Sequence, residues 1–156
     1  MNWRQRIEPV VRPLLQFWWR RTRGMTLGVR AIVLDGEGRV VLVRHTYVQG
    51  WYLPGGGVER GERVELALGR ELAEEAGVEM TGPAKLLGAY SNERQFPGDH
   101  VLLYEVRDWR ACETDHDGEI DAVGWFSLAD LPDATTPATR RRLAEFAGRE
   151  PVSDMW

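Results

Sequence analysis

The chain has 156 residues, enough for one domain with a buried core. Hydrophobic residues make up 43% of it and charged residues 28%, which is typical of a soluble globular protein, and no apolar stretch is long enough to span a membrane. The single cysteine, Cys112, excludes an internal disulfide and has no partner at zinc-binding spacing, so a reducing cytoplasm is the expected location.

The formal net charge of −4 is distributed unevenly along the chain. Residues 1–23 contain six arginines and one glutamate, so they carry +5 and the remaining residues carry −9. An acidic body argues against a nucleic-acid polymer as the main partner, because a phosphate backbone needs a basic surface. The same acidity is compatible with a site that holds divalent cations.

Residues 1–23 are expected to form a basic, Trp-rich helical extension, although Pro9 and Pro13 weaken an uninterrupted helix. Arginines and prolines interrupt every apolar stretch, which excludes a secretion signal. An apolar stripe at helical spacing predicts packing against the domain or against a second copy in a homodimer. The alternative is a helix on a membrane surface, with aromatic residues beside a basic face. The stripe consists of Ile7, Val10, Val11, Leu14, Leu15 and Trp18.

Residues 24–150 are expected to form one domain, followed by a tail over residues 151–156. Two β-branched runs, residues 29–34 and 40–45, flank the turn-forming stretch 35–38 and predict a β-hairpin. The remaining predicted elements are a short strand over 51–53, a helix over 63–76 stopped by Gly77, strands over 86–90, 101–106 and 122–126, and a helix over 137–146 with Thr136 as its N-cap.

This order of elements predicts an α/β fold. Strands outnumber helices, and the two helices stand in mid-chain and at the end, which favours an α/β/α sandwich with a mixed β-sheet between the helices. We expect the 63–76 helix on one face of the sheet and the 137–146 helix on the other.

Three carboxylates share one side of the 63–76 helix. At 100° per residue, Glu71, Glu74 and Glu75 fall within about a third of the circumference, beside an apolar arc that includes Leu68 and Leu72. Like charges this close repel each other, so the cluster requires a compensating cation. Magnesium is the favoured ion, because it prefers oxygen ligands.

The stretch around these glutamates carries a longer pattern. Residues 55–78 read GGGVERGERVELALGRELAEEAGV, which resembles the Nudix hydrolase signature G-x5-E-x7-R-E-U-x-E-E-x-G-U, where U is aliphatic. Every position matches between Gly56 and Val78. Seven fixed identities coincide by chance on the order of 10⁻⁸ or less per window. With the strand order around it, the resemblance extends over residues 25–147.

The resemblance implies a Mg²⁺-dependent hydrolase, with Mn²⁺ as a substitute ion. Its substrate would be a nucleoside di- or triphosphate derivative, in which water attacks phosphorus and cleaves a diphosphate bond. It implies that Glu74 and Glu75 bind the metal and that Glu71 either binds it or acts as general base. Gly56 would offer its carbonyl to the cation, and Arg70 would hold the glutamates in place.

The resemblance also implies residues outside the signature. A further acid before a tryptophan-containing strand often completes such a site, and Glu119 is the candidate, with Asp117 and Asp121 as rivals. The three histidines lack metal-binding spacing and stay unassigned. Candidate substrate-binding residues, each also compatible with a surface or core role, are Arg30 and Arg44 for phosphate and Trp51 and Tyr52 for stacking, with Tyr47, Tyr90 and Phe96 as further aromatics.

Two alternative functions stay open. The first is a catalytically silent nucleotide-binding module, although such proteins usually lose signature glutamates and this chain keeps them all. The second is a pyrophosphatase specific for ADP-ribose or a sugar nucleotide. The ADP-ribose class often has a proline where this chain has Glu93. The sequence therefore favours a generic nucleoside di- or triphosphate derivative as substrate.

Overall fold

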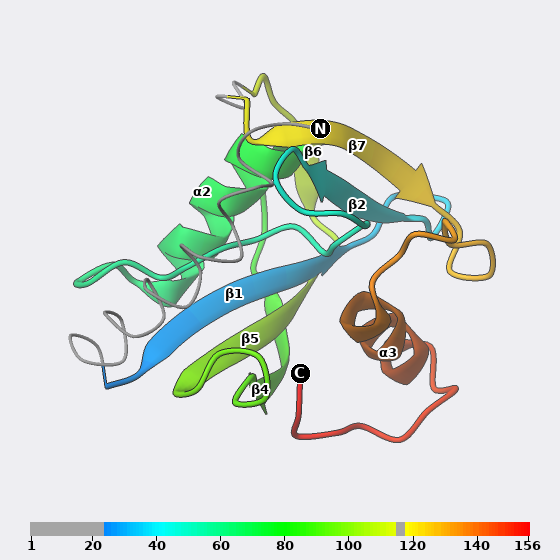
Figure 1. Ribbon diagram of the computed structural model, residues 1–156. Coiled ribbons are helices and arrows are strands. Elements are labelled where there is room, and N and C mark those ends of the chain that lie inside the picture. The colour runs from blue at the N-terminus through cyan, green and yellow to red at the C-terminus, as the bar shows by residue number, and fades with distance from the viewer. Residues whose placement is uncertain (1–23, 115–117) are drawn as a thin grey trace.

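The computed structural model describes residues 24–114 and 118–156 (Figure 1). The predicted extension over residues 1–23 and the rival acid Asp117 lie outside these ranges. No helix in the described ranges is long and apolar enough to cross a membrane. The elements are β1 (Thr26–Val33), β2 (Val40–His45), α2 (Val64–Ala76), β3 (Val78–Met80), β4 (Lys85–Ser91), β5 (Asp99–Val106), β6 (Trp109–Ala111), β7 (Ile120–Phe126) and α3 (Pro137–Phe146).

The strands form three small sheets. In the largest, β5 lies between β1 and β4, parallel to β1 and antiparallel to β4. The other two are antiparallel pairs, β2 with β7 and β3 with β6. The predicted mixture of parallel and antiparallel pairing is therefore present.

The predicted hairpin between β1 and β2 is wrong in its pairing. The turn forms, since the Gly38 N–H donates to the Asp35 carbonyl, but the two strands share only the bridge between Leu34 and Val40. Beyond that bridge β1 pairs with β5 and β2 with β7. Both runs are largely buried, so their apolar pattern contains no information about which neighbour each strand selects.

The two helices cover opposite sides of these strands (Figure 1), which confirms the predicted sandwich. Successive side chains of a strand point to opposite faces. In β1, Val29, Ala31 and Val33 pack in one core with Leu68 and Leu72 of α2. Ile32 of β1 and Leu42 of β2 pack in the second core with Leu143 of α3.

Both helices have the ends predicted from sequence. Gly77 follows α2 with φ 65°, a left-handed conformation that glycine adopts readily, and its N–H donates to the Ala73 carbonyl. At the start of α3 the Thr136 side chain accepts from the Thr139 N–H, and Pro137 occupies the first turn.

The C-terminal segment, residues 151–156, packs back on the domain. The Trp156 N–H donates to the Ser91 carbonyl at 2.9 Å, and the Trp156 ring meets the Tyr90 ring edge-on. Arg142 of α3, fully buried, lies 4.2 Å from the centre of the Tyr90 ring and pairs with Glu145 at 2.5 Å. The segment thereby brings Trp156 to the rim of the cavity described below.

Candidate active site

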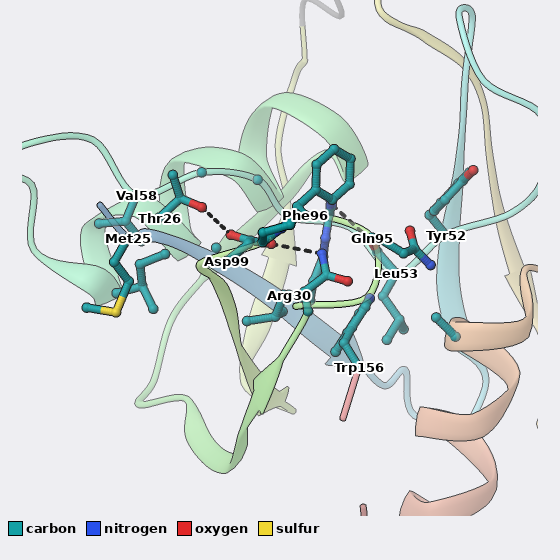
Figure 2. A pocket seen from close by; sticks show the side chains of 18 of the residues that line it. Met25, Thr26, Arg30, Tyr52, Leu53, Val58, Gln95, Phe96, Asp99 and Trp156 are labelled. Atoms are coloured by element: carbon teal, nitrogen blue, oxygen red, sulfur yellow. Dashed lines mark hydrogen bonds between the residues drawn. The ribbon is translucent and has the colours of Figure 1, made fainter. Parts of the chain in front are cut away.

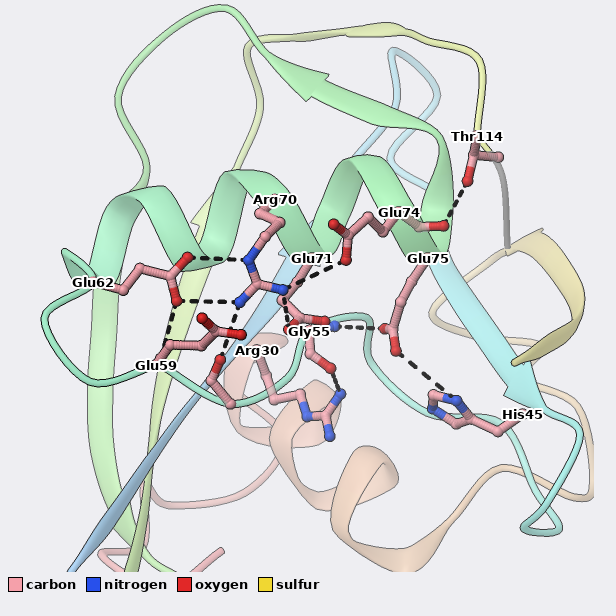
Figure 3. Close-up of polar contacts among 11 residues, drawn as sticks. Arg30, His45, Gly55, Glu59, Glu62, Arg70, Glu71, Glu74, Glu75 and Thr114 are labelled. Atoms are coloured by element: carbon pink, nitrogen blue, oxygen red, sulfur yellow. Dashed lines mark hydrogen bonds and ion pairs between the residues drawn. The ribbon is translucent and has the colours of Figure 1, made fainter. Parts of the chain in front are cut away.

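Arg70 is the centre of a carboxylate network on α2 (Figure 3). Its guanidinium donates to both oxygens of Glu62, at 3.0 and 3.1 Å, to Glu71 at 2.8 Å and to Glu74 at 3.4 Å. It also reaches the Gly57 carbonyl at 3.3 Å. The bond with Arg70 lowers the pKa of Glu62, and the bonds with Glu62 raise the pKa of Arg70. Arg70 therefore holds the glutamates in place, the role that the family resemblance implies for it.

Glu75 points to the glycine-rich loop. It accepts a hydrogen bond from the Gly55 N–H at 2.8 Å, and its side chain is 13% exposed. Burial raises the pKa of Glu75 to about 7, and the charges of Glu71 and Glu119 add to the shift, while Arg30 and the Gly55 bond oppose it. Burial also raises the pKa of Glu71. The ionised forms of Glu71 and Glu75 are therefore disfavoured in the absence of a compensating cation.

Gly55 and Gly56 lie where no side chain fits. A Cβ on Gly56 would lie 2.4 Å from the Glu71 carboxyl group, and a Cβ on Gly55, with φ 135°, would lie 2.1 Å from the Val29 carbonyl oxygen. The Gly56 carbonyl accepts from the Val29 N–H at 2.8 Å, whereas the Gly55 carbonyl accepts from Arg30. Gly55, one residue before the predicted Gly56, therefore provides the backbone contacts with Arg30 and Glu75.

His45 lies beside Glu75 at the end of β2. Its Nδ1 is 3.9 Å from Glu75 Oε1, and this buried nitrogen has no hydrogen-bond partner among the described residues. Burial lowers the pKa of His45 to about 4, and the Arg30 charge acts in the same direction. His45 is therefore neutral near pH 7. Sequence spacing left it unassigned, because only the path of β2 brings it to α2.

The carboxylates suit a hard divalent cation but do not form a closed cage. Within residues 24–114 and 118–156, no three His, Cys, Asp or Glu side chains converge closely enough to hold a metal ion. The reason is that Glu71 and Glu74 accept from Arg70 while Glu75 faces Gly55. Burial raises the pKa of both Glu71 and Glu75, so their ionised forms are disfavoured as they stand, and a cation that prefers oxygen ligands would stabilise those forms.

Two of the candidates for the additional acid, Glu119 and Asp121, lie within the described residues and differ in their surroundings. Glu119 is exposed, and its backbone carbonyl accepts from the Thr46 N–H, which places it beside the end of β2 near His45. Its charge contributes to the raised pKa of Glu75, after burial. Asp121, by contrast, pairs with Arg44 at 2.6 Å. Of the two candidates within the described residues, Glu119 is thus the one that lies electrostatically close to Glu75.

The predicted substrate-binding residues fall into two groups. Arg30 and Tyr52 line a cavity of about 1330 Å³ along β1 (Figure 2), together with Phe96 and Trp156. Arg44 and Trp51 do not line it: the Arg44 guanidinium lies 5.3 Å from the centre of the Trp51 ring, and Trp51 packs edge-on against Phe126. Tyr90 belongs to the core of the α3 side.

Arg30 connects this cavity with the carboxylates. It lines the cavity and donates to the Gly55 and Leu53 carbonyls, and its charge opposes the raised pKa of Glu75. Glu71, Glu74 and Glu75 do not line the cavity themselves, so Arg30 and the Gly55 backbone are the link between the cavity and Glu75.

Comparisons with known proteins identify the family of the chain. The NUDIX domain model matches residues 24–146. The chain is 32% identical over 122 residues to a Bacillus subtilis (strain 168) protein named "Putative 8-oxo-dGTP diphosphatase", with 78% of this chain and 79% of that protein covered. It is 31% identical over 110 residues to a Methanocaldococcus jannaschii protein named "ADP-ribose pyrophosphatase", with 65% and 64% covered.

A solved structure agrees as well. The crystal structure of a MutT NUDIX hydrolase from Burkholderia pseudomallei matches with a TM-score of 0.62 and 31% identity, over 76% of this chain and 95% of that one. The chain therefore belongs to the NUDIX domain family, and both the resemblance found in residues 56–78 and the predicted enzyme class, a Nudix hydrolase acting on nucleotide derivatives, are confirmed.

Proposed function

We propose that the protein is a Mg²⁺-dependent hydrolase that cleaves a diphosphate bond in a nucleoside di- or triphosphate derivative by attack of water at phosphorus. The observation that supports this most is the position of Arg30. Its side chain joins a nucleotide-sized cavity to a loop whose Gly55 N–H binds the buried Glu75.

In this proposal Glu71, Glu74 and Glu75 bind the metal and Glu119 completes its shell. The Gly56 carbonyl is the backbone ligand that the resemblance implies, and the neighbouring Gly55 carbonyl is the alternative. Each already accepts one hydrogen bond, from the Val29 N–H and from Arg30 respectively, and a carbonyl oxygen has a second lone pair to offer. The bound cation supplies charge stabilisation at the phosphate oxygens. One of the signature carboxylates accepts the proton of the attacking water.

The chain's other residues bind and orient the substrate. Arg30 contacts phosphate at the mouth of the loop, where its guanidinium forms bidentate contacts with anionic oxygens. Tyr52 contacts the nucleoside in the cavity. His45, buried beside Glu75, limits the positions that the Glu75 carboxylate can adopt. We propose no substrate contact for Arg44 and Trp51, since neither lines the cavity.

The substrate belongs to the class of nucleoside di- and triphosphate derivatives. The names of the relatives point to different members of it, an oxidised purine triphosphate for the Bacillus protein and ADP-ribose for the Methanocaldococcus protein. A silent nucleotide-binding module is disfavoured, because the chain retains every signature glutamate. We expect Mn²⁺ to be able to replace Mg²⁺. We also expect a cytoplasmic location, because the chain has the single cysteine Cys112.

The decisive experiment is a screen of nucleotide substrates with Mg²⁺, following phosphate release, on the wild type and the Glu75→Gln variant. We expect Glu75→Gln to fold and to lose at least about 10²-fold in kcat, in line with removal of a catalytic electrostatic group. Glu65→Gln is the matched control, because Glu65 is an exposed carboxylate on the same helix.

Two outcomes contradict the proposal. If the Glu75→Gln variant hydrolyses the substrate at the wild-type rate, Glu75 is not a required metal ligand. A wild type that binds nucleotides but hydrolyses none of them with Mg²⁺ or Mn²⁺ supports the silent module in its place.

A further inference from the structure

The cavity has a second polar end, formed by Asp99 at the start of β5 (Figure 2). The Thr26 hydroxyl donates to one Asp99 carboxylate oxygen at 2.6 Å. The buried Asn92 side chain donates to the other at 2.8 Å. Asp99 is therefore held in a fixed orientation while it lines the cavity.

Asp99 has no basic partner in the part of the chain that the structure describes. Within residues 24–114 and 118–156, it has no Lys, Arg or His within ion-pair distance, and its side-chain partners are the neutral Thr26 and Asn92. A carboxylate has about four lone-pair sites on its two oxygens. The two oxygens of Asp99 therefore retain capacity for two more hydrogen-bond donors.

The backbone of β1 relates this end to the catalytic end. Thr26, Gly28 and Arg30 alternate along the strand, so they share the face that lines the cavity. Four steps of a strand separate Thr26 from Arg30 by ~13 Å. Gly28, between them, has no side chain, so the floor of the cavity stays open from Arg30 to Asp99.

We propose that Asp99 determines base specificity by accepting hydrogen bonds from two adjacent N–H groups of the base, the edge that a guanine-type base presents with N1–H and its 2-amino group. This inference rests on the proposed function, with the phosphates at Arg30 and the base at Asp99. A paired carboxylate acceptor suits two neighbouring donors. Adenine and cytosine place a ring acceptor beside their amino group, and uracil places carbonyls on both sides of its N–H. In these bases an acceptor atom would face a carboxylate oxygen of Asp99, and the two would repel each other.

A purely structural role for Asp99 makes a different prediction. Asp99 also joins the ends of the segment between β4 and β5, since the Asn92 N–H donates to the Asp99 carbonyl. If it only stabilises that segment, its substitution changes stability and affects all nucleotides equally.

The test compares GTP with ITP, which differ only by the 2-amino group. For the wild type with Mg²⁺ we expect kcat/KM for GTP to exceed that for ITP by about 10- to 100-fold, the contribution of one charge-assisted hydrogen bond. Asp99→Asn should reduce this ratio to within about threefold, since it removes the charge and replaces one acceptor by a donor. The loss for GTP should appear in KM, because the base lies far from the reacting phosphorus.

Thr26→Val is the matched control. It removes the hydroxyl bonded to Asp99 but leaves the carboxylate, so the GTP to ITP ratio should stay above about tenfold. A wild-type ratio near one overturns the inference, as does an Asp99→Asn variant with an unchanged ratio.

Failure of the proposed function is distinguishable from failure of this inference. If the wild type hydrolyses neither nucleotide, the proposed function fails, and equilibrium binding of GDP and IDP then decides the role of Asp99 by the same ratios. If hydrolysis depends on Mg²⁺ and Glu75 but does not distinguish GTP from ITP, the proposed function stands and the role of Asp99 is refuted.

Discussion

The signature carboxylates on α2 and just before it differ in what compensates their charge. Glu62 and Glu71 accept charged hydrogen bonds from Arg70, whereas the hydrogen bond to Glu75 comes from the neutral N–H of Gly55. Glu75 is also the carboxylate with the pKa raised to about 7 by burial. Its ionisation therefore opposes folding unless a cation is bound, and this links metal binding to pH.

The first consequence is a pH-dependent stability of the metal-free protein. The pKa of Glu75 is raised from 4.5 to about 7 in the folded state, so the protonated form stabilises the fold. This contribution is fully present below about pH 4.5 and is lost as pH rises through 7. Its size is on the order of 3 kcal/mol. In EDTA, urea unfolding should show the wild type losing stability relative to Glu75→Gln between pH 5 and 8.

Added Mg²⁺ should oppose this loss of stability at high pH. Above pH 7 the ionised carboxylate binds the cation, so added Mg²⁺ should raise the free energy of unfolding of the wild type more at pH 8 than at pH 5.5. Glu75→Gln should show a smaller response. A difference between the two proteins in EDTA that stays constant with pH contradicts the assignment.

Residue spacing predicted only part of this site. The helical period alone places Glu71, Glu74 and Glu75 on one side of α2, because the contact is local. Gly55, His45 and Asp99 were not predicted. Their roles depend on the path of the glycine loop along β1 and on strand pairings between distant segments, and no local period encodes these.

At the scale of elements, the ends of helices were easier to predict than the partners of strands. The predicted helix over 63–76 begins one residue later, and α3 matches its prediction. β3 and β6 were missed, because each has three residues and contains charged side chains. Caps and glycine stops are local, whereas strand pairing is a property of the tertiary structure.

Two glycines, Gly69 within α2 and Gly77 at its C-terminal end, should respond oppositely to the same substitution. Gly77 has φ 65°, where an alanine costs about 1–2 kcal/mol, and its added Cβ would lie 3.2 Å from the Cys112 carbonyl oxygen. Gly69 lies within the helix, and its added Cβ would make an ordinary 3.5 Å contact with the flexible end of Met80. Gly69→Ala should therefore stabilise by up to about 1 kcal/mol, through helix propensity.

Urea unfolding of both variants at one pH, with Mg²⁺ present, measures the two effects. Because each protein carries one Gly→Ala change, the effects of the two changes on the unfolded chain largely cancel in the comparison. The assignment of the helix end at Gly77 is wrong if Gly77→Ala is as stable as Gly69→Ala.

At the scale of the whole molecule, the two faces of the sheets have different roles. The α2 side provides the signature carboxylates, while the cavity lies on the face of β1 that points to α3. Arg30 joins the two, and the C-terminal segment adds Trp156 to the cavity wall. The layered plan was predictable from the order of elements, but the contribution of residues 151–156 to the cavity was not, because it depends on backbone bonds with β4.

The sequence of residues 1–23 places the apolar stripe, which includes Ile7, Val11, Leu14 and Trp18, beside six arginines. An apolar patch of this kind drives association when it is left uncovered. Deleting residues 1–23 should therefore lower the free energy of unfolding or convert a dimer to a monomer. It should leave Mg²⁺-dependent hydrolysis intact, because every proposed site residue lies beyond position 23. Light scattering coupled to size-exclusion chromatography and urea unfolding provide the two readouts.

The membrane alternative for residues 1–23 makes a separable prediction. A basic amphipathic helix binds anionic lipid, and its affinity falls as salt screens the arginines. Vesicles containing phosphatidylserine would then sediment the full chain but not the truncated one, and neutral phosphatidylcholine vesicles serve as the control. Sedimentation at physiological salt, with stability and oligomeric state unchanged by the deletion, contradicts packing against protein. If the deletion destabilises the chain or dissociates a dimer and neither protein sediments, the stripe is a protein contact.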